Sequence, residues 1–162
     1  MKSIVVAYDK KRGIGANGRP LWNSGLMQAD SRRFRTLTAN SSVIMGRNAF
    51  ETFHGFLPGR QNIVITRRER MSMGVQMVHS IGEAFEVATS TDINVIGGAS
   101  IYKEALPYVD RVYATELNVE FRGSDAFFPE LNPMQWREVS REYHAADELN
   151  TYDYSFVVYE RA

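Results

Sequence analysis

Residues 93–102 read INVIGGASIY, and their order is the strongest indication of the architecture of this chain. A short apolar run rich in β-branched residues leads into two glycines and then into residues that can begin a helix. Adjacent glycines let a ligand approach the backbone closely, and the free N–H groups of a helix N-terminus attract phosphate. The stretch therefore predicts a strand, a turn and a helix that together form a candidate phosphate site. A tight turn without a ligand is the alternative.

Residues 43–48 read VIMGRN and repeat this arrangement. Arg47 falls at the start of the helix, where the helix dipole disfavours a cation, so an anionic ligand would suit it. A solvated surface arginine is the alternative. A third strand ends in Thr66, followed by Arg67 and Arg68. Three such strand ends indicate a dinucleotide at the carboxyl edge of a parallel sheet. The G-x-G-x-x-G fingerprint of the usual dinucleotide-binding fold is absent.

The rest of the chain alternates in the same way. Apolar runs of strand length occur at 4–8, 43–45, 62–66, 75–78, 93–96, 112–117, 136–143 and 154–159. Helical spacing appears at 30–37, at 84–88 after a Ser80 that can cap, and at 100–106. The pattern predicts an α/β fold with helices flanking a mostly parallel central sheet. No helix separates the last two runs, so we expect them to form an antiparallel C-terminal hairpin at the sheet edge.

The composition excludes several classes of protein. The chain has 162 residues, 19 basic and 19 acidic side chains, three histidines and no cysteine. A zero net charge argues against binding along nucleic-acid phosphates, and the lack of cysteine excludes disulfides and thiolate chemistry. No apolar run reaches the roughly 20 residues that cross a bilayer, and the N-terminal run is too short for a signal peptide. We expect one cytoplasmic domain over residues 1–162, a monomer without a metal, membrane or nucleic-acid partner.

Three local features point to a small-molecule site. Residues 9–28 are rich in glycine, and we interpret them as a lid loop, with a floppy insertion as the alternative. Asp30 shares a helical face with Phe34 and Leu37, so it should point inward, where an unpaired carboxylate needs a partner or a ligand. A helix N-cap is the alternative for Asp30. Arg60 leaves a Pro-Gly turn with a planar fork that suits a carboxylate.

These pieces, in this order, resemble the dihydrofolate reductase family over essentially the whole chain. The resemblance rests on IVVA at 4–7, GIG at 13–15, Trp22, Ala29-Asp30 with Phe34, VIMGR at 43–47, LPGR at 57–60, VIGG at 95–98 with Tyr102, Thr115, Asp125 and Phe128-Pro129. The family places its catalytic acid four residues before a substrate-packing phenylalanine, which selects Asp30. The segment between Trp22 and Asp30 is longer than usual, which leaves the geometry of the lid open.

The resemblance implies hydride transfer from NADPH to C6 of 7,8-dihydrofolate and protonation of N5, which gives 5,6,7,8-tetrahydrofolate. It implies that Asp30 accepts the ring N–H and amino group of the pterin with help from the Thr115 hydroxyl. Trp22 would order water near the pterin, with a plain core tryptophan as the alternative. The other implied substrate contacts are Val6, Ala7, Phe34, Phe53, Leu57 and, for the glutamate carboxylate, Arg60. We expect no other ionisable group beside the ring.

The same resemblance implies an NADPH site at the glycine-rich strand ends. The basic pair Arg47 and Arg67 favours NADPH over NADH, because a bare ribose would leave two cations unpaired. The implied cofactor contacts are Ala7, Ile14, Gly15, Gly46, Arg47, Asn48, Ala49, Thr66, Arg67, Ile96, Gly97, Gly98, Ala99, Ser100, Ile101 and Tyr102. We interpret Trp136 as a core residue and His54, His79 and His144 as surface or structural residues, although His79 could reach the adenosine phosphate.

Two other functions are alternatives. One is another NADPH-dependent reductase of the same fold, such as that of riboflavin synthesis. It needs neither an acid under a pterin nor an arginine for a glutamate tail, so Asp30 and Arg60 disfavour it. The other is a non-catalytic nucleotide-binding module whose lid no longer closes. Such a module would bind NADPH without turning it over.

Overall fold

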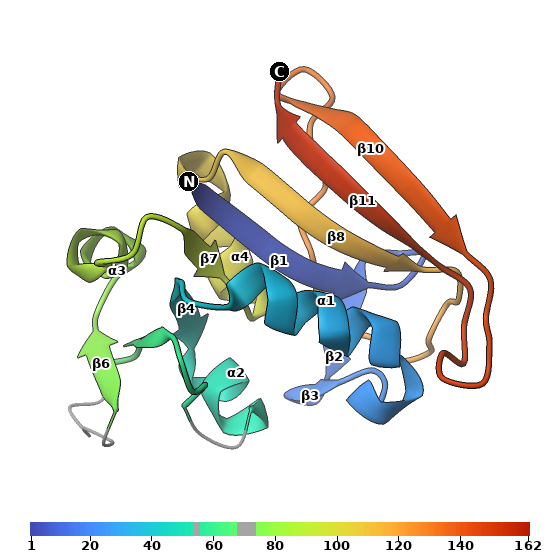
Figure 1. Cartoon of the computed structure of the whole chain (residues 1–162), viewed down its shortest axis with the longest axis horizontal. Helices are drawn as coiled ribbons and strands as arrows, with labels where there is room; N and C mark the ends of the chain where they lie inside the picture. Colours follow the sequence, from blue (N-terminus) through green and yellow to red (C-terminus); the bar gives the residue numbers. More distant parts are fainter. Residues whose placement is uncertain (54–55, 68–73) are drawn as a thin grey trace.

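One central sheet positions every other element (Figure 1). The structure is a computed structural model that describes residues 1–53, 56–67 and 74–162, so His54 and Arg68 lie outside the described residues. Over this part of the chain the strand order is β10-β11-β8-β1-β7-β4-β5-β6. The strands are β1 (Lys2–Tyr8), β4 (Ser42–Gly46), β5 (Gln61–Ile65), β6 (Val75–Val78), β7 (Ile93–Val95), β8 (Arg111–Leu117), β10 (Trp136–His144) and β11 (Tyr154–Arg161).

Helices cover both faces of this sheet, as the α/β prediction requires. They are α1 (Gln28–Thr38), α2 (Arg47–Thr52), α3 (Ile81–Val87) and α4 (Ala99–Ala105), with short 3₁₀ turns η1 (Ser24–Leu26) and η2 (Leu106–Tyr108). Side chains of α1 and α2 pack on one face, and those of α3 and α4 pack on the other. Figure 1 shows α1 in front of the sheet, next to β1.

The alternation of side chains along β1 divides the core in two. Ile4 and Val6 pack with the residues of α3 and α4, whereas Val5 packs with those of α1 and α2. Successive side chains of a strand point to opposite faces, so a strand buried on both sides must be apolar throughout. Burying each large aliphatic side chain contributes about 1.5–3 kcal/mol. This explains why the central strands read as unbroken apolar runs.

The predicted strands and helices are confirmed, with ends that agree within three residues. β1, β8, β7, β4, β5 and β6 pair in parallel, and β11 and β10 pair antiparallel, so the C-terminal hairpin is confirmed as well. The Ser80 hydroxyl accepts the Glu83 N–H at 3.1 Å, which confirms the predicted cap of α3. Trp136 is 4% exposed, in agreement with its interpretation as core.

The interpretation of residues 9–28 as a plain loop is wrong in part. The segment contains β2 (Gly13–Ala16) and β3 (Arg19–Pro20), which form a small sheet with β9 (Ala126–Phe127). These strands have two to four residues and are built largely of small or polar side chains, so no apolar alternation announces them. The segment is thereby tied to the loop before β9, where the Asn17 N–H donates to Asp125 at 3.0 Å.

A buried carboxylate fixes the start of this segment. Asp9 is 2% exposed and accepts the backbone N–H groups of Lys11 and Gly13 with one oxygen, at 2.9 and 2.8 Å. Its other oxygen accepts the Phe121 N–H at 3.0 Å. Three hydrogen bonds from backbone N–H groups replace those that the carboxylate loses to water when it is buried. Asp9 therefore joins the 9–28 segment to the chain that follows β8.

Two classes of site are absent from the described part of the chain. No helix within residues 1–53, 56–67 and 74–162 is long and apolar enough to cross a membrane. Over the same ranges, no three His, Asp or Glu side chains gather where they could hold a metal ion.

Candidate active site

Asp30 lies at the beginning of α1, on the side that faces the sheet. The helix begins at Gln28 and Met27 occupies the N-cap position, so the alternative of Asp30 as the cap is wrong. Asp30 falls in the first helical turn, and Phe34, one turn later on the same face, packs against the cluster that contains Val5. Asp30 therefore lies on the same face of α1 as the apolar residues that pack against the sheet.

Opposing influences act on the acidity of Asp30. Burial raises the pKa of Asp30, whereas the Thr115 hydroxyl and the Arg33 guanidinium lower it, and the effect of burial prevails. A carboxyl group of this kind exchanges a proton nearer to neutral pH than an exposed aspartate does. It is also suited to accept a pair of N–H groups from a bound ring.

Strand register brings Thr115 to the same place. Thr115 of β8 is paired with Ala7 of β1 on one side and with Phe156 of β11 on the other. Side chains in register project to the same face of a sheet, here the face that α1 covers. Thr115 is 2% exposed, so its hydroxyl is a fixed neighbour of Asp30.

The predicted apolar substrate contacts lie together. The rings of Phe34 and Phe53 stack with their centroids 5.5 Å apart, and Leu57 packs against the same buried cluster. The Leu57 N–H donates to the Asn62 side chain at 2.7 Å, which fixes the turn that carries it. Val6 differs, because its side chain lies in the core on the opposite face. Only the backbone of Val6 can meet a ligand on the α1 side.

Arg60 is held between the C-terminal half of α1 and the turn at Pro58. Its Nε donates to the Thr38 hydroxyl at 3.1 Å, and its two Nη atoms donate to the carbonyls of Pro58 and Arg35 at 2.6 and 3.0 Å. These partners are neutral, and no carboxylate pairs with Arg60 among the residues described. A rigid guanidinium without a counter-charge is suited to bind an anionic group.

Trp22 lies in the lid segment, partly buried against aromatic residues. Its ring stacks on Phe121 with centroids 5.7 Å apart, and Phe121 meets Tyr152 edge-on at 5.4 Å. All three pack against a cluster that contains Met27, which is fully buried. Trp22 therefore packs on the edge of a small core, and its role in a lid stays a prediction.

The long segment before α1 is docked on the turn between β10 and β11. It forms η1 (Ser24–Leu26) and then meets residues 149–151. The Gln28 N–H donates to the Leu149 carbonyl at 3.1 Å, and the Ala29 N–H donates to the Asn150 side chain at 2.9 Å. Asn150 thus supplies, from a distant part of the chain, an acceptor for the free N–H groups at the start of α1.

A cavity of about 890 Å³ opens at the carboxyl ends of β4, β5 and β7. Its lining includes many of the predicted cofactor contacts: Gly46, Arg47, Asn48, Ala49, Thr66, Arg67, Gly98, Ala99, Ser100 and Ile101. It also includes residues that were not among the predicted cofactor contacts: Gly18, Ile65, Ser80, Ile81, Glu104 and Ala126. A cavity at the carboxyl edge of parallel strands is where open α/β sheets bind nucleotides.

Two arginines and a histidine line this cavity: Arg47, Arg67 and His79. Arg47 pairs with Glu51 at 3.1 Å, Arg67 is exposed, and His79 lies with its Nδ1 atom 3.0 Å from the Thr66 carbonyl. Residues that carry positive charge beside a cavity of this size fit a phosphorylated dinucleotide. His79, which the sequence placed within reach of the adenosine phosphate, lines the cavity.

Six predicted cofactor contacts lie outside this lining: Ala7, Ile14, Gly15, Ile96, Gly97 and Tyr102. Gly97 is joined to Gly98 by a cis peptide bond, and its carbonyl accepts the Gly46 N–H at 2.8 Å, which ties two glycine-rich turns together. The Tyr102 hydroxyl donates to the Val5 carbonyl at 2.8 Å under this pair. These contacts shape the floor of the region between Asp30 and the cavity.

The sequence-based search missed Arg33 and Asn150. Arg33 is close enough to Asp30 to lower its pKa, so the acid has an ionisable neighbour, and the expectation of no other ionisable group beside the ring stays a prediction. The signal for Arg33 was present, because it stands three residues after Asp30, on the same helical face. For Asn150 no local signal exists, since its contact spans the chain from residue 29 to residue 150.

Comparisons with known proteins agree on one family. The family model described as dihydrofolate reductase matches residues 1–161. The dihydrofolate reductase of Staphylococcus haemolyticus is 37% identical over 161 residues, which cover 98% of this chain and 95% of the relative. That of Bacillus subtilis is 37% identical over 163 residues, covering 99% of this chain and 95% of the relative.

A solved structure matches at the level of the fold. Dihydrofolate reductase from Enterococcus faecalis, complexed with NADP(H) and RAB-propyl, superposes with a TM-score of 0.88 at 30% identity. The match covers 99% of this chain and 96% of that chain.

Proposed function

The chain belongs to the dihydrofolate reductase family, and from this premise we propose which of its residues carry out the chemistry. The protein is an NADPH-dependent oxidoreductase that reduces 7,8-dihydrofolate to 5,6,7,8-tetrahydrofolate. NADPH, when bound, supplies the hydride for C6 of the substrate, and N5 receives a proton. The observation that supports the residue assignment is a carboxylate at the start of α1, beside a buried hydroxyl and an aromatic wall.

Asp30 anchors the pterin and supplies the charge that the reaction needs. Its carboxylate accepts the ring N–H and the exocyclic amino group side by side, and the Thr115 hydroxyl completes this contact. A negative charge next to the ring favours the protonated form of N5, so the proton arrives where positive charge develops. Trp22 closes the region from the lid side and orders the water that carries the proton.

The remaining substrate contacts follow the shape of the molecule. Phe34, Phe53 and Leu57 pack against the pterin and benzoyl rings, and the backbone of Val6 and Ala7 forms the floor. Arg60 receives the α-carboxylate of the glutamate tail, and its uncompensated charge supports this role. The arrangement of one anion for the ring and one cation for the tail distinguishes this substrate from a riboflavin-pathway intermediate.

The cofactor contacts are proposed on the cavity at the strand ends. Arg47, Thr66 and Arg67 surround the 2′-phosphate, which favours NADPH over NADH. The backbone of Gly97, Gly98 and residues 99–102 approaches the pyrophosphate, and Ala7, Ile14 and Gly15 hold the nicotinamide end. The space beside Gly98 is open, because a Cβ atom there would meet nothing within 4 Å. This supports the close approach of a ligand to the backbone.

Several further assignments go beyond the family itself. We propose that residues 1–162 form one domain of this kind and that the enzyme acts as a monomer in the cytoplasm, on a small-molecule substrate and without nucleic acid or membrane. Size-exclusion chromatography with light scattering tests the monomer, and two copies in one particle would contradict it.

The function is tested by following NADPH absorbance with and without dihydrofolate. We expect oxidation only when dihydrofolate is present. In Asp30→Asn, which removes the charge but keeps the shape, we expect kcat at neutral pH to fall about 10²–10⁴-fold, while NADPH binding and the circular dichroism spectrum stay unchanged. Asp92→Asn is the matched control, because Asp92 is exposed and pairs with the N-terminus at 3.6 Å. Full turnover in Asp30→Asn would remove Asp30 from its role.

A further inference from the structure

Arg33 connects α1 to the strand that carries Thr115. Its Nη1 atom donates to the Ala114 carbonyl at 2.9 Å, and its guanidinium lies 4.4 Å from the centroid of the Phe156 ring. Ala114 precedes Thr115 on β8, and Phe156 is the partner of Thr115 in register. Arg33 is therefore held by two contacts next to Thr115: a hydrogen bond to the preceding residue of β8 and a cation–π contact with the residue opposite on β11.

The position of Arg33 on α1 links these contacts to Asp30. The two residues are three apart in the helix and occupy neighbouring positions on one face. Because α1 is rigid between them, holding Arg33 against β8 also fixes the distance between Asp30 and Thr115. Burial lowers the pKa of Arg33, but a guanidinium starts so high that it stays charged at neutral pH.

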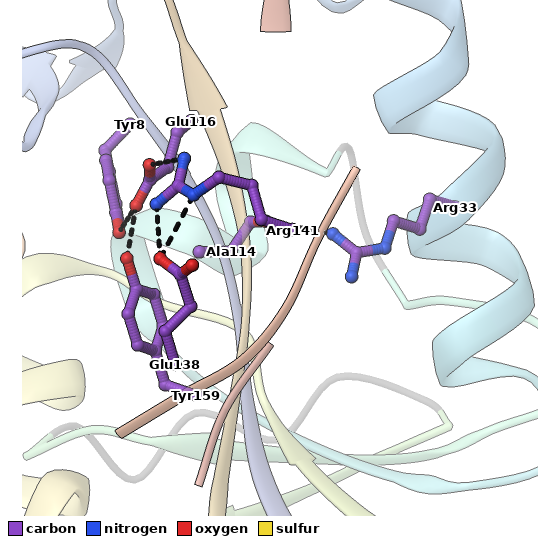
Figure 2. Close-up of polar contacts among 7 residues, drawn as sticks. All are labelled: Tyr8, Arg33, Ala114, Glu116, Glu138, Arg141 and Tyr159. Atoms are coloured by element: carbon purple, nitrogen blue, oxygen red, sulfur yellow. Dashed lines mark hydrogen bonds and ion pairs between the residues drawn. The ribbon is translucent and has the colours of Figure 1, made fainter. Parts of the chain in front are cut away.

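The opposite face of β8 is held separately, by a polar network (Figure 2). The Glu116 carboxylate accepts hydrogen bonds from the hydroxyls of Tyr8 and Tyr159, at 2.8 and 2.7 Å. It also accepts one from the Arg141 guanidinium at 2.9 Å, and Arg141 donates to Glu138 as well. Figure 2 shows this network on one side of the strand and Arg33, on α1, on the other. The charge of Arg33 is therefore not part of that network, and the two can be altered independently.

We propose that Arg33 is a positioning residue for the reaction: it holds Asp30 beside Thr115 and places a fixed positive charge next to the reacting carboxylate. The proposal rests on the role of Asp30 given above. The groups that face Asp30 are Arg33, Thr115 and Tyr102, and those that face Arg33 are Asp30, Tyr113 and Glu142. Among the described residues that face Asp30, Arg33 alone carries a positive charge at neutral pH.

The sign of the effect follows from this arrangement. A cation beside a carboxyl group favours its ionised form and opposes positive charge on a bound ring. Removing the cation should therefore make both Asp30 and N5 of the substrate more basic. The falling limb of the pH–rate profile should then move to higher pH.

The test compares Arg33→Gln, which removes the charge but keeps a donor for the Ala114 carbonyl, with Arg33→Lys, which keeps the charge. Arg32→Gln is the matched control, since Arg32 is exposed on the same helix. Single-turnover hydride transfer is measured from about pH 6 to about pH 9 for each variant. We expect the ratio of the rate at about pH 9 to that at about pH 6 to rise about twofold or more in Arg33→Gln, and to stay near the wild-type value in Arg33→Lys and Arg32→Gln.

A second measurement needs neither cofactor nor turnover. Aspartate side-chain carboxyl carbons are titrated by ¹³C NMR in the ligand-free protein, and the Asp30 signal is the one missing in Asp30→Asn. We expect Asp30 to titrate at higher pH in Arg33→Gln than in wild type, Arg33→Lys or Arg32→Gln. If Arg33→Gln does not fold, Arg33→Met, which keeps the contact with the Phe156 ring, takes its place.

The outcomes separate this proposal from the function itself. Coincident Asp30 titrations in wild type and Arg33→Gln would overturn it, as would equal shifts in Arg33→Gln and Arg33→Lys, because packing rather than charge would then be responsible. Loss of the Asp30 role would appear instead as full turnover in Asp30→Asn, whatever happens at Arg33.

Discussion

At the scale of the residue, Gly97 and Gly98 make opposite demands although they are neighbours. Gly97 has a φ of +123°, and a Cβ atom there would lie 3.3 Å from the Tyr102 hydroxyl. Gly98 has a φ of −87°, and a Cβ atom there would meet no protein atom within 4 Å. Gly97 is thus needed by the fold, whereas Gly98 leaves room beside the cavity.

The same change at the two positions should therefore have different effects. We expect Gly97→Ala to lower the free energy of unfolding by about 1–3 kcal/mol, because alanine is strained at this φ and displaces Tyr102. We expect Gly98→Ala to change stability by less than about 0.5 kcal/mol but to raise the KM for NADPH about tenfold, because the methyl group takes ligand space. Denaturant unfolding and steady-state kinetics measure both, and equal loss of stability in the two variants would contradict this division.

At the scale of the element, the start of α1 depends on a side chain from the far end of the chain. The N-cap residue Met27 offers no side-chain hydrogen bond, and Asn150 replaces it by accepting the Ala29 N–H at 2.9 Å. Asn150 is 4% exposed, and its Nδ2 atom donates to Asp147 at 2.9 Å, which fixes its orientation. The first turn of α1, and with it Asp30, is held in place by the turn between β10 and β11.

We expect Asn150→Ala to lower the free energy of unfolding by about 1–2 kcal/mol, since it removes a helix cap and leaves the partly buried Ala29 N–H without its acceptor. Because Asp30 is one residue beyond Ala29, kcat should also fall several-fold, while the affinity for NADPH, bound at the other helices, should not change. Glu148→Ala, an exposed change in the same turn, is the control. A stability loss with wild-type kcat would show that the cap does not position Asp30.

Features that arise from neighbouring residues could be predicted from the sequence. Features that depend on contacts between distant parts of the chain could not. The parallel strands were predictable because burial on both faces leaves an apolar run in the sequence, as in β4 and β7. The helical spacing of Asp30 with Phe34 and Leu37 suggested an inward carboxylate, and the family resemblance selected it over a helix cap. β2, β3 and β9 were not predictable, because backbone pairing and the buried Asp9, rather than apolar side chains, hold them. The roles of Arg33 and Asn150 depend on contacts with β8 and the distant hairpin turn.

At the scale of the whole molecule, the network around Glu116 joins the ends of the chain to the middle of the sheet. Tyr8 lies on β1, Glu116 on β8, Tyr159 on β11 and Arg141 on β10. The network also borders a cavity of about 580 Å³ on the face opposite α1. It therefore connects four strands through one carboxylate.

The stability of the protein should depend on pH through this carboxylate. Burial favours the neutral form, but hydrogen bonds from Tyr159, Tyr8 and Arg141 outweigh it and lower the pKa of Glu116. A lowered pKa contributes stability above the unfolded-state value of about 4.3, and the contribution is lost as the pH falls through the folded-state pKa. Burial and Glu116 raise the pKa of Tyr8 and bring that of Tyr159 to about 12. Their contribution is present below about pH 10 and lost as the pH rises through these folded-state values.

Glu116→Gln should therefore lower the free energy of unfolding by about 2 kcal/mol at neutral pH, since it leaves Arg141 without one of its carboxylates and removes a charged acceptor from two tyrosines. The difference from wild type should shrink as the pH falls below about 4 and through the lowered folded-state pKa of Glu116, and as the pH rises above about 10 and the tyrosine contribution of wild type is lost. Denaturant unfolding across this pH range measures it. Glu120→Gln, which breaks the exposed pair of Glu120 with Lys11, should cost less than about 1 kcal/mol. A Glu116→Gln deficit that is constant with pH would mean that packing, not ionisation, holds the four strands together.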